Sequence, residues 1–282
     1  MMARIAGLAL AVGCGVTTAE QEQAIVGGTP DPADEAVVAI VERPLCSTEA
    51  TIACTGTLIA PQIVLTAAHC MPPGATREVH VGSPVGAGQF VDMVDAIRHP
   101  RFDDATHAYD LAIVRLAEPV SVPPVALPTG TLDASFAGAT VRVVGYGVVS
   151  AGAIADGERR TGTMAIEAVD ALTFTATPAP SNTCGGDSGG PVFVAVGAGE
   201  QLLGVTAAGD PTCTTRAVDG RVDISVADFI QPYLDMPVPA PDPHGDPCKP
   251  PSMDDGCCAA GTPSAALVLL LVGCRSRRRR RA

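Results

Sequence analysis

Gly185-Gly186-Asp187-Ser188-Gly189-Gly190-Pro191 is the stretch that constrains the fold and chemistry of this chain of 282 residues most tightly. Glycines on both sides of the serine let the backbone turn sharply, so the hydroxyl is exposed while neighbouring N–H groups point to the same place. The acidic residue before the serine can turn inward. A serine nucleophile beside an oxyanion hole requires this combination, although a glycine-rich surface turn would also fit these seven residues alone.

A nucleophilic serine needs a base within hydrogen-bond reach, usually a histidine that a carboxylate orients. His69 follows the strand-like run Ile63–Leu65, and Asp110 begins the alternating, β-branched run Asp110–Leu116. An aspartate at the start of a strand can be buried while its side chain points sideways at a histidine. The sequence therefore predicts that Ser188, His69 and Asp110 act together.

Four segments of the chain resemble the signature segments of the chymotrypsin/trypsin-like serine peptidases, in the order of that family: Ile25–Gly28, Leu65–Cys70, Asp110–Leu116 and Gly185–Pro191. The resemblance covers roughly residues 25–236, and four motifs in order are far more specific than one. It implies a serine endopeptidase that works through an acyl-enzyme. The alternative is a surface binding module that keeps the peptidase fold and has lost catalysis.

The resemblance also implies a role for each site residue. Ser188 attacks the scissile carbonyl, His69 accepts and returns the proton, and Asp110 fixes the tautomer of His69. The backbone N–H groups of Gly186 and Ser188 bind the oxyanion. Cleavage before Ile25 frees an α-amino group that pairs with Asp187 and activates the enzyme.

Residue 24, before the expected activation site, is alanine, so an activator with tryptic specificity is not implied. The specificity pocket carried over from the resemblance has Asn182 at its floor, where a charge-selecting relative has an aspartate. Its remaining residues are Ala207, Gly209 and Gly220. We therefore expect uncharged, medium-sized side chains at the P1 position, the residue whose carbonyl is attacked. Asp210 and Asp219 lie nearby in sequence; we expect both to be solvated loop acids, while a role in binding a cation stays open.

Ten cysteines in a chain with an N-terminal targeting segment indicate an oxidising compartment. The resemblance implies two disulfides, Cys54–Cys70 beside His69 and Cys184–Cys213 beside the pocket. Cys46 has no assigned partner, and Cys248 is the nearest candidate. The cysteine spacings do not suggest metal ligands. No metal or other cofactor is implied. We expect the remaining histidines to be surface or strand residues: His80, His99, His107 and His244.

Both ends of the chain have the composition of targeting segments. Residues 1–19 have the charge, apolar run and small residues of a signal peptide, which leaves a pro-segment of residues 20–24. A lipoprotein signal with lipidation at Cys14 is an alternative. Residues 237–256 form a linker rich in proline and aspartate. The tail, residues 257–282, begins at the cysteine of an acidic Gly-Cys motif (Asp254–Cys258), continues with a short apolar run and an arginine cluster, and resembles a MYXO-CTERM sorting tail.

Such a tail implies a bacterial protein that processing peptidases cleave at both ends. The tail associates with the membrane before it is removed, and the product is secreted or associated with the outer membrane. A plain tail anchor is the alternative, although the apolar run is at or below the usual spanning length. Residues 25–256 carry 11 Lys and Arg and 28 Asp and Glu, a net charge of −17 against −12 for the whole chain. This acidity argues against nucleic acid as a partner and suits an extracellular enzyme that acts on proteins or peptides.

Short β-rich runs alternate with glycine- and proline-rich turns, which is typical of an all-β barrel or sandwich. The resemblance sharpens this to two six-stranded Greek-key β-barrels, about 25–118 and 129–225, with a terminal helix at 226–235 and the active site in the cleft between the barrels. Glu118–Pro128 is expected to cross between them, and Arg159-Arg160 is a candidate nick site. The runs are Ala36–Val41, Thr57–Ile59, Ile63–Leu65, Ala112–Leu116, Thr140–Val144, Ala165–Val169, Thr173–Ala176, Pro191–Val196, Leu202–Thr206 and Arg221–Ile224.

Overall fold

The computed structural model describes residues 25–44, 47 and 49–240. The expected signal peptide, pro-segment, sorting tail and most of the linker lie outside these residues, as do Cys14, Cys46 and Cys248. Within the described part of the chain, no helix is long and apolar enough to span a membrane.

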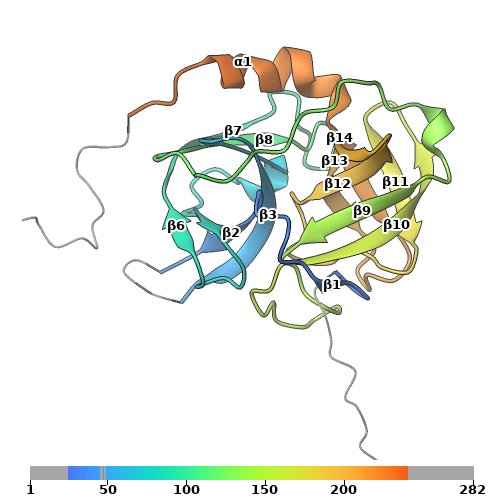
Figure 1. The fold of residues 1–282 in the computed structure, drawn as a ribbon, viewed down its shortest axis with the longest axis horizontal. Coiled ribbons are helices and arrows are strands. Elements are labelled where there is room, and N and C mark those ends of the chain that lie inside the picture. The colour runs from blue at the N-terminus through green and yellow to red at the C-terminus, as the bar shows by residue number, and fades with distance from the viewer. Residues whose placement is uncertain (1–24, 45–46, 48, 241–282) are drawn as a thin grey trace, which may run out of the picture. The chain divides into compact units, whose positions relative to one another are not determined.

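The N-terminal half of the domain is one curled antiparallel sheet of seven strands in the order β6-β5-β2-β3-β4-β8-β7 (Figure 1). No pairing joins its edge strands β6 and β7, so the sheet is a half-barrel. Valine and isoleucine dominate β2 and β4, which are buried over nearly their whole length, as expected for strands in a two-layer core. The strands are β2 (Val37–Glu42), β3 (Thr51–Ala60), β4 (Ile63–Thr66), β5 (Glu78–Val81), β6 (Gln89–Val91), β7 (Met93–Arg98) and β8 (Ala112–Leu116).

The C-terminal half is a second antiparallel sheet in the order β1-β10-β11-β14-β13-β12-β9. A further pairing of β9 with β10 closes six of these strands into a barrel, and β1 adds to the edge of β10. The strands are β1 (Thr29–Pro30), β9 (Thr140–Gly145), β10 (Arg160–Val169), β11 (Thr173–Pro178), β12 (Pro191–Val196), β13 (Gly199–Gly209) and β14 (Ala217–Arg221). The expected all-β architecture with two barrels is confirmed, with the first barrel open along one edge.

Helical structure is confined to short segments. The chain crosses between the two sheets after β8, and it contains only the 3₁₀ turn η2 (Ala134–Phe136) before β9. After β14 come the 3₁₀ turn η3 (Asp223–Ser225), the π-helical turn η4 (Val226–Ile230) and helix α1 (Gln231–Asp235). The expected strand Arg221–Ile224 is therefore wrong beyond its first residue, because the chain turns into η3 there.

The core consists of two apolar clusters in which aliphatic residues outnumber aromatic ones. The smaller cluster fills the closed barrel and includes Ile25, Met164 and Phe174. The larger cluster fills the half-barrel and continues to Phe229 and Ile230 of the C-terminal turn. Dense packing of branched aliphatic side chains explains how the chain buries a core without tryptophan.

The expectation of a nick site at Arg159-Arg160 is wrong. Arg159 is 2% exposed, and Arg160 is 6% exposed and begins β10. The guanidinium of Arg159 donates to the carbonyl of Val37 at 3.2 Å and to the hydroxyl of Tyr146 at 3.2 Å. A buried, hydrogen-bonded arginine at the start of a strand cannot enter a protease cleft without local unfolding.

Candidate active site

His69 lies in the 3₁₀ turn η1 (Ala68–Cys70), directly after β4. Asp110 is fully buried and comes immediately before Leu111 and strand β8, the partner of β4. Nδ1 of His69 lies 2.7 Å from Oδ2 of Asp110, and the backbone N–H of His69 donates to Oδ1 at 2.9 Å. These two bonds fix the position of the histidine on the carboxylate and leave Nε2 on the far side of the ring.

The carboxylate of Asp110 also contacts a second histidine. Nδ1 of His107 lies 3.2 Å from Oδ2 of Asp110, and the rings of His107 and His69 meet edge to face with centroids 5.7 Å apart. Burial opposes ionisation of Asp110, but the bonds from both histidines outweigh it and lower its pKa. Sequence reasoning placed His107 among the surface or strand histidines. Its spacing, three residues before Asp110, was the signal that could have identified it.

The loop that carries Ser188 docks on the N-terminal half-barrel. Thr55 of β3 donates its backbone N–H to the carbonyl of Ser188 and its hydroxyl to the carbonyl of Gly186, both at 2.8 Å. A Cβ at Gly189 would collide with the hydroxyl of Thr66, at the end of β4, and this residue has a φ of +84°. Glycine is therefore required here, and the contact places the serine loop beside the strand that leads into His69.

No hydrogen bond links the Ser188 hydroxyl to His69 within the described residues; such contacts are often long in proteins without substrate. The backbone N–H groups of Gly186 and Ser188 donate no hydrogen bond within the same part of the chain, whereas the N–H of Asp187 between them donates to the carbonyl of Cys184 at 3.1 Å. Gly186 has a φ of +93°. Two N–H groups on one turn, without an acceptor among the described residues, can stabilise a developing negative charge.

Asp187 is 1% exposed and turns away from the surface. Its carboxylate accepts the N–H of Gly147 at 2.8 Å and the N–H of Cys184 at 2.9 Å. Burial raises the pKa of Asp187 to about 7 despite these bonds. Among the described residues no cationic side chain forms an ion pair with it, and Arg160 acts on it only at a distance. Ile25 is fully buried in the same barrel.

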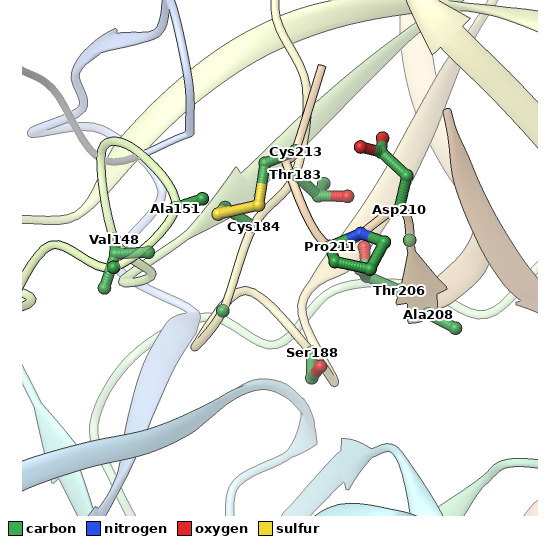
Figure 2. Close-up of a pocket in the computed structure, with 13 residues that line it drawn as sticks. Val148, Ala151, Thr183, Cys184, Ser188, Thr206, Ala208, Asp210, Pro211 and Cys213 are labelled. Atoms are coloured by element: carbon green, nitrogen blue, oxygen red, sulfur yellow. A yellow bond between two sulfur atoms is a disulfide. The ribbon is translucent and has the colours of Figure 1, made fainter. Parts of the chain in front are cut away.

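A cavity of about 320 Å³ opens beside Ser188 (Figure 2). Strand β13 supplies Thr206, Ala208 and Gly209 to its wall. Of the four expected pocket residues, only Gly209 lines it. A register shift between Thr206 and Ala208 takes Ala207 out of the wall.

The other two expected pocket residues lie elsewhere. Asn182 is buried, pairs with Val26 in an isolated bridge and has no hydrogen bond to either side-chain amide atom. Gly220 pairs with Val205 and faces the backbone of Asp110.

The two acids near this cavity differ sharply. Asp210 accepts the hydroxyl of Thr212 and several N–H groups of its own turn, including that of Thr215 at 2.8 Å, and these bonds lower its pKa. Its side chain is at the rim and points away from Ser188 (Figure 2). Asp219 in β14 is fully buried. The expectation of a solvated acid is therefore wrong for Asp219, because a strand of the closed barrel carries it.

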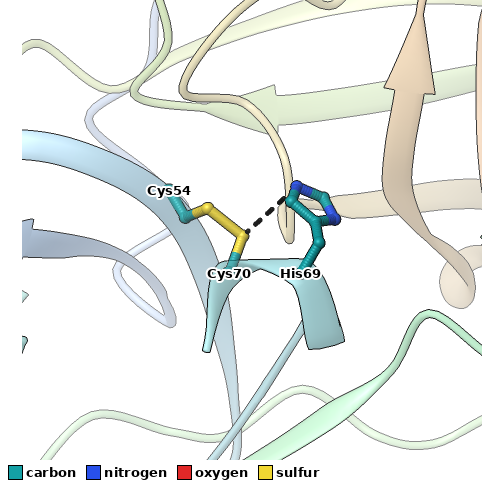
Figure 3. Close-up of side chains that lie close together, drawn as sticks. All are labelled: Cys54, His69 and Cys70. Atoms are coloured by element: carbon teal, nitrogen blue, oxygen red, sulfur yellow. Dashed lines mark hydrogen bonds between the residues drawn. A yellow bond between two sulfur atoms is a disulfide. The ribbon is translucent and has the colours of Figure 1, made fainter. Parts of the chain in front are cut away.

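Both implied disulfides are present, Cys54–Cys70 and Cys184–Cys213. The first ties β3 to the turn of His69, whose Nε2 lies 3.7 Å from Sγ of Cys70 (Figure 3). The second lies along the cavity beside Ser188 (Figure 2).

Donor atoms of His69, His107 and Asp110 lie within 4.8 Å of one another, and two imidazoles with a carboxylate are a set that zinc accepts. A metal there would replace the bond between His69 and Asp110.

The fold and the site together define a two-barrel all-β protein in which the loop of Ser188 is docked on β3 and β4, next to the turn that carries His69 and its partner Asp110. The Trypsin family model matches residues 25–230, and the chain belongs to that family. It is 29% identical over 176 residues to a trypsin of Saccharopolyspora erythraea, covering 56% of this chain and 75% of that protein. It is 33% identical over 130 residues to trypsin 5G1 of Aedes aegypti, covering 44% and 47% of the two chains.

Proposed function

We propose that this protein is a serine endopeptidase in which Ser188, His69 and Asp110 form the catalytic triad. The observation that carries the proposal is the 2.7 Å contact between Nδ1 of His69 and Asp110, next to the docked loop of Ser188. The histidine accepts the serine proton on Nε2 as the hydroxyl attacks the carbonyl, and Asp110 stabilises the resulting imidazolium. The N–H groups of Gly186 and Ser188 receive the oxyanion.

Ser188→Ala tests this proposal, since it removes the nucleophile and little else. We expect hydrolysis of an unstructured protein such as casein to fall by at least about 10³-fold. Ser121→Ala, on the exposed crossing segment, is the matched control and is expected to keep full activity. A Ser188→Ala protein that retains amide hydrolysis would refute the proposed nucleophile. If neither hydrolysis nor serine-directed labelling occurs in the unchanged protein, the alternative of an inactive binding module stands.

Activation is the second part of the proposal. A buried carboxyl with a pKa near 7 and no ion-pair partner among the described residues is a receptor for a cation, and the buried Ile25 belongs to the same barrel. Cleavage before Ile25 supplies an α-amino group to Asp187, and the pair holds the Gly186–Ser188 turn in its active form. Protein that begins at Ile25 is therefore active, and protein that keeps residues 20–24 is not. Equal activity of the two forms would refute this step.

The ends of the chain complete the proposal. The signal peptide, residues 1–19, directs the protein out of a bacterial cell and is cleaved after residue 19; the C-terminal tail holds the protein at the membrane until a processing peptidase cleaves near Cys257. Family membership and the two disulfides support an oxidising, extracellular setting. Mass spectrometry of the secreted protein is expected to give Ile25 as the N-terminus and no arginine cluster at the C-terminus. Recovery of the full tail in purified membranes would favour a permanent anchor.

A further inference from the structure

Thr55 in β3 places a buried hydroxyl group where the two barrels meet the loop of Ser188. The residue is 0% exposed. Its hydroxyl donates to the carbonyl of Gly186 at 2.8 Å and accepts the backbone N–H of Tyr146, directly after β9, at 3.1 Å. A threonine hydroxyl has one proton to donate, and this one is committed to the nucleophile loop. The hydroxyl therefore links the half-barrel, the end of a strand of the closed barrel and the loop.

Gly186 is held by one hydrogen bond on each side of its Cα. On one side, the carbonyl of Gly185 accepts the N–H of Val148 at 2.7 Å. Because the C=O and N–H of a trans peptide point in opposite directions, this bond turns the N–H of Gly186 away from Val148. On the other side, the carbonyl of the peptide between Gly186 and Asp187 accepts the hydroxyl of Thr55. Both peptide planes that flank Gly186 are thereby fixed.

The bond from Thr55 differs from the other one in its origin. It comes from a side chain and from the opposite barrel, whereas Val148 follows β9 and uses its backbone. Gly186 has a φ of +93° and no side chain to restrain it, so its N–H can turn to other directions when either bond is lost. Gly147 donates its N–H to the carboxylate of Asp187 at 2.8 Å. The segment after β9 therefore anchors the acid, while Thr55 anchors the glycine before it.

We propose that Thr55 is a positioning residue, whose hydroxyl holds the N–H of Gly186 in the orientation that binds the oxyanion. The inference rests on the proposed function and adds a residue to it. The hydroxyl acts through the backbone of Gly186 and takes no part in the bond changes. Its removal should therefore slow the chemical step and leave the binding of substrate unchanged, because the oxyanion exists only beyond the ground state.

A purely structural role for Thr55 can be separated from this one. Its backbone N–H donates to the carbonyl of Ser188, and its carbonyl accepts the hydroxyl of Thr66, each at 2.8 Å. Replacing the side chain removes neither bond, so the loop as a whole stays docked. Thr57, two residues further along β3, is also 0% exposed, and its hydroxyl has no hydrogen bond among the described residues. The same substitution at Thr57 is therefore a matched control.

Thr55→Val keeps the size and branching of the side chain and removes the hydroxyl. In protein that begins at Ile25, we expect kcat for a peptide amide to fall about tenfold, which lies between the value of one hydrogen bond and the loss of an oxyanion donor. KM should not change, so kcat and kcat/KM fall by the same factor. Thr55→Ser restores the hydroxyl and should restore most of kcat, and Thr57→Val should leave both constants unaltered. Equal effects of the two valine variants, or a change in KM alone, would overturn the inference.

Hydrogen exchange separates this inference from the proposed function, because it needs no turnover. The N–H of Asp187 donates to the carbonyl of Cys184 within the turn, and its exchange rate, followed by NMR, reports how often the turn opens. In Ser188→Ala protein that begins at Ile25, adding Thr55→Val should raise this rate at least about tenfold. Adding Thr57→Val should not raise it.

Thr55→Ala removes the same hydroxyl and serves as the second variant if Thr55→Val does not fold. Unchanged exchange at Asp187 would refute the role of Thr55 even in an active enzyme. Faster exchange, together with no hydrolysis by the unchanged protein, would support the hold of Thr55 on the turn and refute only the peptidase.

Discussion

Asp187 and Asp219 are both buried in the C-terminal half of the domain, and burial raises the pKa of each, to about 7 and about 8. They differ in what surrounds the carboxyl group. Asp187 accepts two backbone N–H groups at 2.8 and 2.9 Å, whereas Asp219 accepts none. The first is held in a fixed orientation that suits a permanent partner from its own chain. The second is fully buried, and no hydrogen bond from the described residues holds its carboxyl oxygens.

The largest effect should come from Asp187. Replacing it by asparagine removes the charge that the Ile25 α-amino group needs, so the Gly186–Ser188 turn loses its active geometry. We expect kcat to fall by about 10²–10³-fold, the cost of losing an oxyanion donor. Single-turnover kinetics on protein that begins at Ile25 measure this directly. Loss of activity through KM alone would contradict the role assigned to Asp187.

Asp219 should instead make the stability of the folded protein depend on pH. Burial raises the pKa of Asp219 from the ordinary range of an aspartate to about 8, so the folded state binds a proton that the unfolded state releases. Stability from this group is present at low pH and declines as the pH rises from about 4 to 8. Asp219→Asn in the Ser188→Ala background should therefore unfold at a higher temperature at pH 8, with the gap closing toward pH 4. A constant gap would mean that Asp219 does not titrate as described.

His107, which contacts Asp110, should have a smaller effect on kcat/KM. Removing its bond to Asp110 with His107→Ala raises the pKa of that carboxyl group. We expect kcat/KM to fall roughly fivefold, the value of one hydrogen bond, and most strongly at acid pH. His107→Gln can still donate to the carboxylate and is the matched control. If the two variants behave alike, the contact with Asp110 does not carry the effect.

The smallest expected effect that involves Asp187 is a decline in the rate of hydrolysis on the alkaline side of the pH–rate profile. In the activated form proposed above, a pair with Asp187 is expected to raise the pKa of the Ile25 α-amino group, so the pair should be intact below that value and lost as the pH rises through it. Acetylation of that amine should remove activity at every pH. A profile that stays flat on its alkaline side would show that the pair does not form.

The sequence predicted much of this molecule because the decisive residues carry local signals. Glycines that tolerate no Cβ flank Ser188, and β-branched runs marked most of the buried strands. Strands β5 to β7 were missed because each is short or contains polar residues that interrupt its apolar pattern, and β14 was missed because aspartate and glycine interrupt it. Two site features depend on the fold. His107 meets Asp110 through a loop with a φ of +54°, and the depth of Asp219 follows from strand pairing.

The most direct test is to map the residue that a fluorophosphonate probe modifies, by peptide mass spectrometry, in protein that begins at Ile25 and in protein that keeps residues 20–24. We predict a single adduct, on Ser188, in the first protein and almost none in the second. An adduct on another residue, or equal labelling of the two proteins, would contradict the account.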